Sequence, residues 1–434
     1  MSHEGEPRPF AILPRSLAPL GFRNYLLYWV GFAVSNTGKN IELTGAVWLA
    51  SQLDSSPVLL GLLGIARAVP SLLLGPISGV VADRFDQRKL LFVTQGLGLF
   101  ASAGLGLLVL TGSVQLWHIY LQVAIQASIM AFDGSARQAL FPQLVPRSRL
   151  GEAVTLRTTA SRLSAFTGPA VGGLAIAAFG VASPFVLNAA TFPVLMAAVI
   201  RIQGVQGAVR DPGTSIRGEF IEGIRHVTGA PILVGLLKME IVFNLFQVNP
   251  VMVTIIARDV IHVGPEGLGG LLSADALGGL VGLSTLLVFG HTRRQGRFNL
   301  LCTSAYASAL VLFGSSEIYW LSFTALAVTG AMDVLITVTR SHILQLATPP
   351  RLRGRVMGNL GMITRGVGPL AQTQNGVLTG IIGGPLAVIG AAVALGVNAV
   401  LTARTNKPLW DFSRDEERLP AAVAISPISE PPDS

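Results

Sequence analysis

The chain has 434 residues, of which 51% are hydrophobic and only 12% are charged. Soluble domains carry about 25% charged residues, so this composition excludes an ordinary soluble protein and places most of the chain in lipid. Lysine and arginine outnumber aspartate and glutamate, 31 to 23, which gives a formal net charge of +8. Because the cations lie between apolar runs, we expect them to face membrane lipids and expect no nucleic acid partner.

Twelve stretches are apolar enough to cross a bilayer as helices, each of which needs about 20 residues. They lie at 25–49, 58–81, 90–110, 114–136, 154–179, 185–200, 232–257, 268–289, 300–313, 319–339, 356–382 and 386–401. The sequence therefore predicts an all-α membrane protein with twelve transmembrane helices. We expect five parts: a cytoplasmic N-terminal segment at 1–21, a six-helix repeat at 22–200, a cytoplasmic linker with an amphipathic helix at 201–230, a second six-helix repeat at 231–404, and a disordered cytoplasmic tail at 405–434.

The two halves of the chain resemble each other. Residues 59–63 match 268–272 at an offset of 209, and residues 131–133 match 331–333 at an offset of 200. Residues 143–144 match 345–346 at an offset of 202. Offsets that stay this close predict two parallel six-helix repeats, which in transporters enclose the substrate site at their interface.

The distribution of cations predicts the orientation of the chain. Alternate connections between the spans are rich in arginine and lysine, whereas the opposite connections contain one cation, Arg258. Cytoplasmic loops carry the excess of positive charge, so we expect both termini to be cytoplasmic.

A burst of charge at 79–89 separates the second and third spans and follows Gly75, one helical turn before Gly79. Glycines at this spacing allow close approach of membrane helices. The stretch resembles the loop between the second and third helices of the major facilitator superfamily, in which a glycine and three residues precede Asp-Arg and a basic cluster. The matching residues are Gly79, Asp83, Arg84, Arg88 and Lys89, whereas Asp86 and Gln87 stand where the family commonly has Gly and Arg. The resemblance implies a transporter fold in a bacterial inner (plasma) membrane, with this loop as part of a gate.

Glu42 lies well inside the first span, one turn from Lys39. One interpretation is a structural ion pair between these two residues. The other is a carboxylate that takes up and releases a proton as a cavity alternates between the membrane faces. Asp133 and Asp333, at matching positions of the two halves, are further candidates for proton coupling. Asp133 also lies four residues before Arg137, which favours a cytoplasmic gate formed with Asp83 and Arg84.

Polar side chains inside several spans are candidates for contact with substrate. Polarity in a lipid-buried helix is tolerated where it lines a cavity, and helix packing is the alternative explanation. The candidates are Asn36, Asn40, Gln122, Gln126, Asn244 and Gln247.

The fifth span contains Gly168, Pro169, Gly172 and Gly173. This run resembles the core of a motif that marks proton-coupled exporters of the superfamily, and Ser164 replaces the glycine that usually opens it. A proline that kinks the helix, with glycines that allow close packing, predicts a seal or hinge between the repeats.

No phosphate-binding loop, metal-ligand pair or catalytic constellation occurs, so we expect neither an enzyme nor a cofactor, and expect the proton gradient to supply the energy. The resemblance covers about residues 20–403 and is nearest to the bacterial branch of enterobactin exporters and macrolide efflux proteins. It implies a monomeric antiporter that exports small amphipathic molecules such as drugs or siderophore-like compounds. Two alternatives stay open: an importer or lipid mover of the same fold, and a membrane scaffold or sensor that no longer transports.

Overall fold

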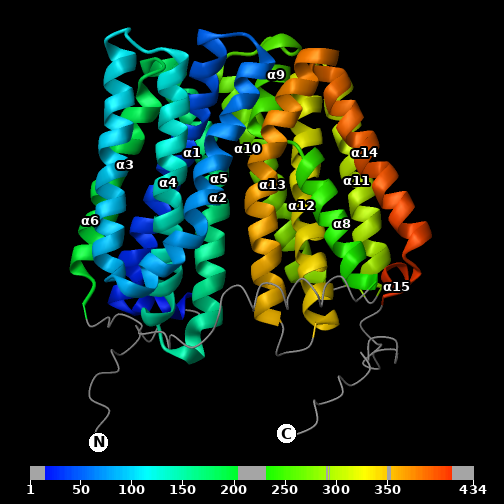
Figure 1. Ribbon diagram of the computed structural model, residues 1–434, viewed down its shortest axis with the longest axis horizontal. Coiled ribbons are helices and arrows are strands. Elements are labelled where there is room, and N and C mark those ends of the chain that lie inside the picture. Colours follow the sequence, from blue (N-terminus) through cyan, green and yellow to red (C-terminus); the bar gives the residue numbers. More distant parts are fainter. Residues whose placement is uncertain (1–14, 204–230, 290–291, 293, 349–352, 413–434) are drawn as a thin grey trace, which may run out of the picture.

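The computed structural model describes residues 15–203, 231–289, 292, 294–348 and 353–412, and these form helices and connections without a strand. Figure 1 shows the long helices standing side by side in two groups. The first half contains α1 (Arg23–Leu53), α2 (Pro57–Arg84), α3 (Gln87–Leu110), α4 (Leu116–Leu140), α5 (Leu150–Phe179) and α6 (Ser183–Arg201). The second half contains α8 (Pro231–Phe246), α9 (Pro250–Asp259), α10 (Pro265–Phe289), α11 (Gln295–Ser315), α12 (Tyr319–Ala347), α13 (Arg353–Ile382) and α14 (Gly384–Thr405).

Within the described residues, nine stretches are long and apolar enough to cross a membrane, one of them formed by α8 and α9 together. The remaining long helices are α1, α4 and α13. Each carries polar residues in its middle, and that polarity lowers its mean hydropathy. The predicted all-α fold with twelve spans is confirmed, and the three least apolar spans contribute to the interior polar sites described below.

The seventh span is broken between α8 and α9. Asn249 begins α9, because its side-chain oxygen accepts hydrogen bonds from the backbone nitrogens of Val251 and Met252, each at 3.1 Å. Pro250 occupies the first turn, where its missing N–H removes no hydrogen bond. Tyr306 satisfies part of the break by accepting a hydrogen bond from the backbone of Val248 at 2.9 Å. The break places the polar side chains of Asn244, Gln247 and Asn249 at the central cavity described below.

Several predicted boundaries are too narrow, because polar ends of helices extend beyond the apolar runs. The ninth span, predicted at 300–313, is α11 at Gln295–Ser315, and the tenth extends from the predicted 339 to Ala347. The tail predicted from 405 begins too early, since α14 ends at Thr405 and a further short helix, α15 (Lys407–Trp410), follows. Leu409 of α15 is buried against the second half, which holds this segment in place. The predicted linker helix at 201–230 lies almost entirely outside the described residues.

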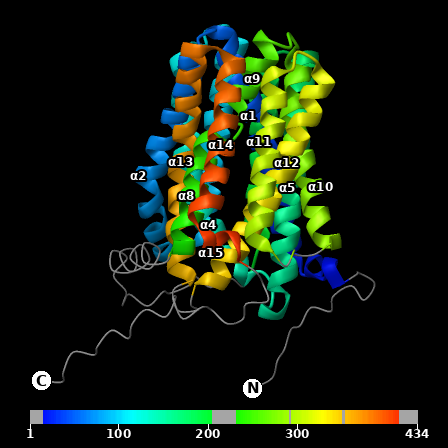
Figure 2. The same ribbon diagram turned by 90° about the vertical axis from the view of Figure 1, so that its right-hand side faces the viewer.

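The two halves meet along two helix pairs, α2 with α13 and α5 with α10 (Figure 2). Small residues make both contacts. A Cβ added to Gly61 of α2 would lie 2.9 Å from the Cα of Gly376 in α13, and one added to Gly173 of α5 would lie 3.0 Å from the Cα of Gly269 in α10. The backbones therefore touch directly, as glycine contacts between membrane helices allow.

One end of the bundle carries most of the cations. We call it the basic end: it is the end where α1 begins and α14 ends, and it includes Arg84, Arg88, Lys89, Arg149, Arg297 and Arg404. Both glycine contacts between the halves lie toward the opposite end, near the start of α2 and α10 and the end of α5 and α13.

Candidate functional site

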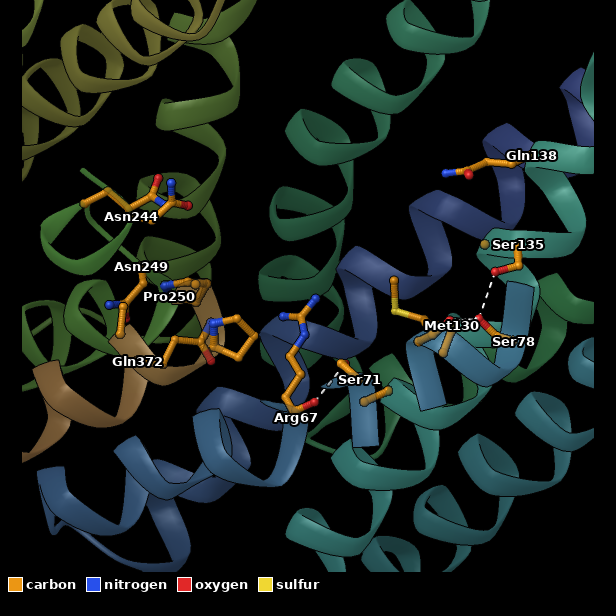
Figure 3. A pocket seen from close by; sticks show the side chains of 18 of the residues that line it. Arg67, Ser71, Ser78, Met130, Ser135, Gln138, Asn244, Asn249, Pro250 and Gln372 are labelled. Atoms are coloured by element: carbon orange, nitrogen blue, oxygen red, sulfur yellow. Dashed lines mark hydrogen bonds between the residues drawn. The ribbon is translucent and has the colours of Figure 1, made fainter. Parts of the chain in front are cut away.

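A central cavity of about 550 Å³ lies between the halves. Its walls come from α2 and α4 of the first half and from α8, α9 and α13 of the second (Figure 3). The size falls in the range of about 300–1,000 Å³ that is usual for small-molecule sites. Besides Arg67, the described residues that give its wall hydrogen-bonding groups are Ser71, Ser78, Ser135, Gln138, Asn244, Gln247, Asn249 and Gln372.

The cavity is closed at the end away from the basic end. There, the hydroxyl of Thr373 in α13 donates to the backbone oxygen of Gly61 in α2 at 2.8 Å. Arg258, at the end of α9, donates to the backbone oxygens of Ser51 at 2.9 Å and Ser55 at 3.0 Å in the first half. The only cation predicted on this side thus ties the two halves together.

Toward the basic end the same helices stand apart. A Cβ added to Gly75 or Gly79 of α2, or to Gly368 of α13, would meet nothing within 4 Å. The close packing expected at Gly75 and Gly79 is therefore absent in this conformation. Both glycines face open space because α2 and α13 make their contact nearer their other ends. The conformation is closed at one end and open toward the basic end.

Glu42 lies in a second, smaller cavity of about 180 Å³ that shares Arg67, Ala127 and Met130 with the central one. Its carboxylate is buried, with 5% exposure. It accepts hydrogen bonds from the hydroxyl of Ser102 at 2.5 Å and from the amide of Gln122 at 2.7 Å. The amide of Asn188 also donates to it, and the amide of Gln126 lies at 3.4 Å.

These neighbours suit both protonation states of Glu42. An amide can rotate and present its oxygen, and a hydroxyl both donates and accepts, so each can serve a neutral carboxyl group as well as a charged one. An ammonium or guanidinium group could not do so. Within the part of the chain that the structure describes, Glu42 makes no ion pair. The groups that bond Glu42 within the described residues are therefore all neutral.

The surroundings of Asp133 are different. Its carboxylate pairs with Arg137 at 2.7 Å and with Lys39 at 3.2 Å, and it accepts a hydrogen bond from Gln95 at 2.6 Å. Lys39 therefore forms its ion pair with Asp133. Its position one turn from Glu42 in the sequence had suggested a pair with Glu42 instead. Loss of the Asp133 charge would leave two cations unpaired in the bundle, which is costly. The partners that Asp133 has among the described residues all belong to the first half, so the cluster of Asp133, Arg137, Lys39 and Gln95 does not bridge the halves in the present conformation.

The second half contains a related ion pair that the sequence analysis missed. Arg340 of α12 donates a hydrogen bond to Glu240 of α8. Its guanidinium lies over the ring of Phe243, with the Cζ atom 5.4 Å from the ring centre. Glu240 also accepts a hydrogen bond from Asn244 at 2.9 Å, and Asn244 accepts one from Gln247 at 3.1 Å. The ion pair therefore holds two predicted substrate-contact residues at the cavity wall. A signal was available, since Arg340 follows Arg137 at an offset of 203, close to the offsets of the repeat.

Asp333, the matching residue of Asp133, lies elsewhere. Its carboxylate accepts a hydrogen bond from Thr337 at 3.4 Å and interacts electrostatically with Arg162 of α5, a helix of the first half. Arg162 reaches the contact of α5 with α10, where its guanidinium would lie 3.4 Å from a Cβ added to Gly279. Asp333 is thus placed beside the seam between the halves and is absent from the lining of the two cavities.

The other predicted substrate-contact residues divide between the cavities. Asn244 and Gln247 line the central cavity, whereas the remaining four line the smaller cavity around Glu42: Asn36, Asn40, Gln122 and Gln126. Ser102 and Asn188, which bind Glu42 directly, were not singled out from the sequence because a lone serine or asparagine in an apolar run gives no signal.

The loop at 79–89 lies at the basic end. Arg84 and Lys89 are exposed, and the side chain of Asp83 lies outside the described part of the chain. Arg88 donates to the backbone oxygen of Ile202 at 2.8 Å, at the end of α6. Asp86 begins α3 by accepting a hydrogen bond from the backbone nitrogen of Arg88 at 2.9 Å. Partial burial works against its charge, but this bond and the Arg88 cation hold the pKa of Asp86 below its usual range.

The motif in α5 lies between two helices. A Cβ on Gly168 would come within 2.4 Å of the Cβ of Asn40 in α1, and Gly172 packs on the same helix near Ile41. Gly173 faces the opposite way, toward α10 of the second half. The motif thus joins α1 to the contact between the halves.

Comparisons with known proteins agree with this architecture. The family described as transmembrane secretion effectors matches residues 15–426. The chain is 28% identical to the MFS-type transporter YfiS of Bacillus subtilis, over 85% of this chain and 90% of that protein. It is 25% identical to the multidrug efflux pump Tap of Mycolicibacterium fortuitum, over 87% and 95% of the two chains, and 26% identical to the enterobactin exporter EntS of Escherichia coli strain HS, over 75% and 73%.

Solved structures show the same fold at lower identity. A bacterial homologue of the human lysosomal transporter Spinster, in an inward-facing and unoccupied conformation, superposes with a TM-score of 0.70 at 14% identity, covering 91% of this chain and 99% of that one. The nucleoside transporter NupG gives a TM-score of 0.71 at 11% identity, covering 90% and 100%.

Proposed function

Because the chain belongs to the transmembrane secretion effector family of major facilitator transporters, we propose that it exports small amphipathic molecules in exchange for protons. It is a multi-pass membrane transport protein and not an enzyme. In our proposal the basic end faces the cytoplasm, in keeping with the excess of positive charge on cytoplasmic loops. Substrate then enters the open cavity from the cytoplasm. The halves rock about the contacts of α2 with α13 and α5 with α10, and the substrate leaves on the other side.

The observation that carries proton coupling is the environment of Glu42. This carboxylate is buried in a cavity that shares Arg67, Ala127 and Met130 with the central cavity, and its bonding partners can donate or accept. Asp133 is held by two cations and Asp333 lies at the seam, so Glu42 is the best proton carrier of the three candidates. A carboxylate inside a bilayer helix is a functional group by default.

Export as the direction is supported by the efflux pump Tap and the enterobactin exporter EntS, which align over most of their length with this chain. The glycine and proline motif of α5 supports the same direction through its resemblance to the exporter motif. The substrate's polar contacts are then made by Asn244, Gln247 and Gln372 on the second half and by Ser71 and Gln138 on the first.

The first test is accumulation of a panel of dyes, antibiotics and siderophores in cells with and without the protein, each with and without a protonophore. If protons drive export, cells with the protein should accumulate less of a substrate than cells without it, and the protonophore should abolish this difference. Higher accumulation would instead indicate import. No difference across the panel would contradict export of these compounds and favour lipid movement or a role without transport.

The second test uses Glu42→Gln in proteoliposomes with a substrate identified by the panel. The variant should lose transport driven by a proton gradient by at least tenfold but retain exchange of labelled for unlabelled substrate, because exchange requires no net proton movement. The matched control is Glu152→Gln, which removes a carboxylate paired with Arg149 at 3.2 Å at the protein surface. Unchanged proton-driven transport by Glu42→Gln would eliminate this carboxylate as the proton carrier.

A further inference from the structure

The central cavity contains a cation that neither the proton site nor the contacts between the halves uses. Arg67 extends from α2 into the space between the two halves (Figure 3). Among the described residues that line this cavity it is the only one with a formal charge. Its backbone oxygen accepts a hydrogen bond from Ser71 at 2.8 Å, but within the described residues its guanidinium makes no ion pair or hydrogen bond.

An unpaired guanidinium at this depth is unusual. A charged group within a bilayer helix carries a large free-energy cost unless it pairs with another group or faces a water-filled cavity. Three other cations of the described interior have ion-pair partners, since Lys39 and Arg137 share Asp133 and Arg340 pairs with Glu240. Arg162 of α5 interacts electrostatically with Asp333. Helix packing does not require the charge at Arg67 either, since the side chain projects into the cavity (Figure 3).

The groups around Arg67 form a suitable site for an anion. A guanidinium presents five N–H donors in a planar fork that matches carboxylates, sulfonates and phosphates. Across the cavity lie the amides of Asn244 and Asn249, and the nitrogen of the Asn249 amide is a buried donor for which the described residues supply no acceptor. Met130, Val248 and Pro250 add apolar surface to the same wall.

We propose that Arg67 binds the anionic group of the substrate, so that the transported molecules are amphipathic anions with one acidic group and an apolar body. This inference rests on the proposed transport function and specifies its substrate class. Arg67 also lines the smaller cavity that contains Glu42, so the proposed anion site lies next to the proposed proton site.

The experiment compares two probes that share a ring system. The anion is 8-anilinonaphthalene-1-sulfonate and the neutral analogue is N-phenyl-1-naphthylamine. Binding of each is measured by equilibrium dialysis against the full-length protein in nanodiscs of zwitterionic lipid, with empty nanodiscs subtracted. Wild type, Arg67→Gln, Arg67→Lys and the control Arg404→Gln are compared, since Arg404 is an exposed cation at the end of α14, away from the cavity.

The expected result is saturable binding of the sulfonate to the wild type, at least tenfold tighter than binding of the neutral analogue. Arg67→Gln should weaken sulfonate binding at least tenfold and leave binding of the neutral probe unchanged. Arg67→Lys should bind the sulfonate with an affinity between those of the wild type and Arg67→Gln, because a lysine keeps the charge without the planar fork. Arg404→Gln should behave as the wild type. Anionic lipid added to the nanodiscs should compete if the natural anion is a lipid headgroup, and a soluble organic acid should compete if it is not.

Three outcomes of the binding experiment would overturn the proposal. One is a wild type that shows no preference for the sulfonate, including a lack of saturable binding to either probe. Another is Arg67→Gln with undiminished sulfonate binding. The third is an equal loss of binding of both probes in Arg67→Gln, which would indicate that Arg67 has a structural role. Proton-driven export of neutral or cationic compounds alone would overturn the anion inference while leaving the proposed function standing, whereas anion binding dependent on Arg67 without any transport would overturn only the proposed function.

Discussion

Gly61 offers the sharpest test of how the two halves hold the present conformation. A Cβ at this position would lie 2.9 Å from the Cα of Gly376, 3.1 Å from the backbone oxygen of Thr373 and 3.3 Å from that of Gln372. All three atoms belong to the backbone of α13, so no side chain can move aside. The substitution Gly61→Ala must therefore push α2 away from α13 at the closed end.

The magnitude follows from the contacts that are lost. Overpacking of a tight contact costs about 1–3 kcal/mol. Separation of the helices also weakens the bond from Thr373 to the Gly61 backbone oxygen, now 2.8 Å long, and such a bond contributes about 0.5–1.5 kcal/mol. Together these effects should destabilise the present conformation by about 2 kcal/mol relative to a conformation in which this contact is open. Since 1.4 kcal/mol is a factor of ten, the ratio of the two conformations should shift by roughly 30-fold.

Spin labels can measure this shift. Labels at Gln138→Cys in α4 and Leu346→Cys in α12, both exposed, report the separation of the halves near the basic end. The buried Cys302 would first be replaced by serine. Double electron–electron resonance should show a larger population with a short distance in Gly61→Ala, because opening one end closes the other.

The matched control is Gly104→Ala in α3, where an added Cβ would meet nothing within 4 Å. It reproduces the gain of about 0.5–1 kcal/mol that alanine brings over glycine inside any helix. A distance distribution for Gly61→Ala that is identical to that of Gly104→Ala would refute the reasoning, since it would mean that the close contact does not stabilise this conformation.

Three further substitutions test the surrounding structure. Asp133→Ala should lower stability by about 3–5 kcal/mol, because it leaves two cations unpaired, and should lower the melting temperature of the purified protein. Gly75→Val should fold normally, since its surroundings are open in this conformation, but should reduce transport at least tenfold if α2 and α13 approach there when the basic end closes. Arg258→Gln removes the bonds to the backbone of Ser51 and Ser55. It should shift the spin-label distances in the same direction as Gly61→Ala. The free-energy difference between the two conformations should change by about 1 kcal/mol, because the Arg258 side chain is partly exposed.

Each of these outcomes has a clear opposite. An unchanged melting temperature for Asp133→Ala would show that the cations find other partners, and Asp133→Ala combined with Arg137→Gln should cost less than the sum of the two single changes. Full transport by Gly75→Val would mean that this face of α2 stays open throughout the cycle. A shift of the Arg258→Gln distances in the opposite direction would show that Arg258 belongs to the other conformation.

Much of the architecture was predictable because a bilayer imposes a simple rule on sequence. A segment that crosses it must be long, apolar and helical, so the order and number of spans could be read directly from the apolar runs. The offsets near 200 between the halves predicted the repeat, and continuing them would have paired Arg137 with Arg340. The ends of helices were less predictable, as α11 and α12 show, because hydropathy falls where the apolar run ends while the helix continues through polar residues at the membrane surface.

The partners of the buried charges were decided only by the tertiary structure. Lys39 lies one turn from Glu42 in sequence, yet it pairs with Asp133 on another helix, and Glu42 is surrounded by Ser102, Gln122 and Asn188 from three different helices. The sequence by itself determined the composition of each helix, its span and the presence of charges at Glu42 and Arg67. It could not determine which faces of the helices meet, because that depends on contacts between residues distant in the chain. Those contacts leave Arg67 in the cavity and leave Glu42 without an ion pair among the described residues.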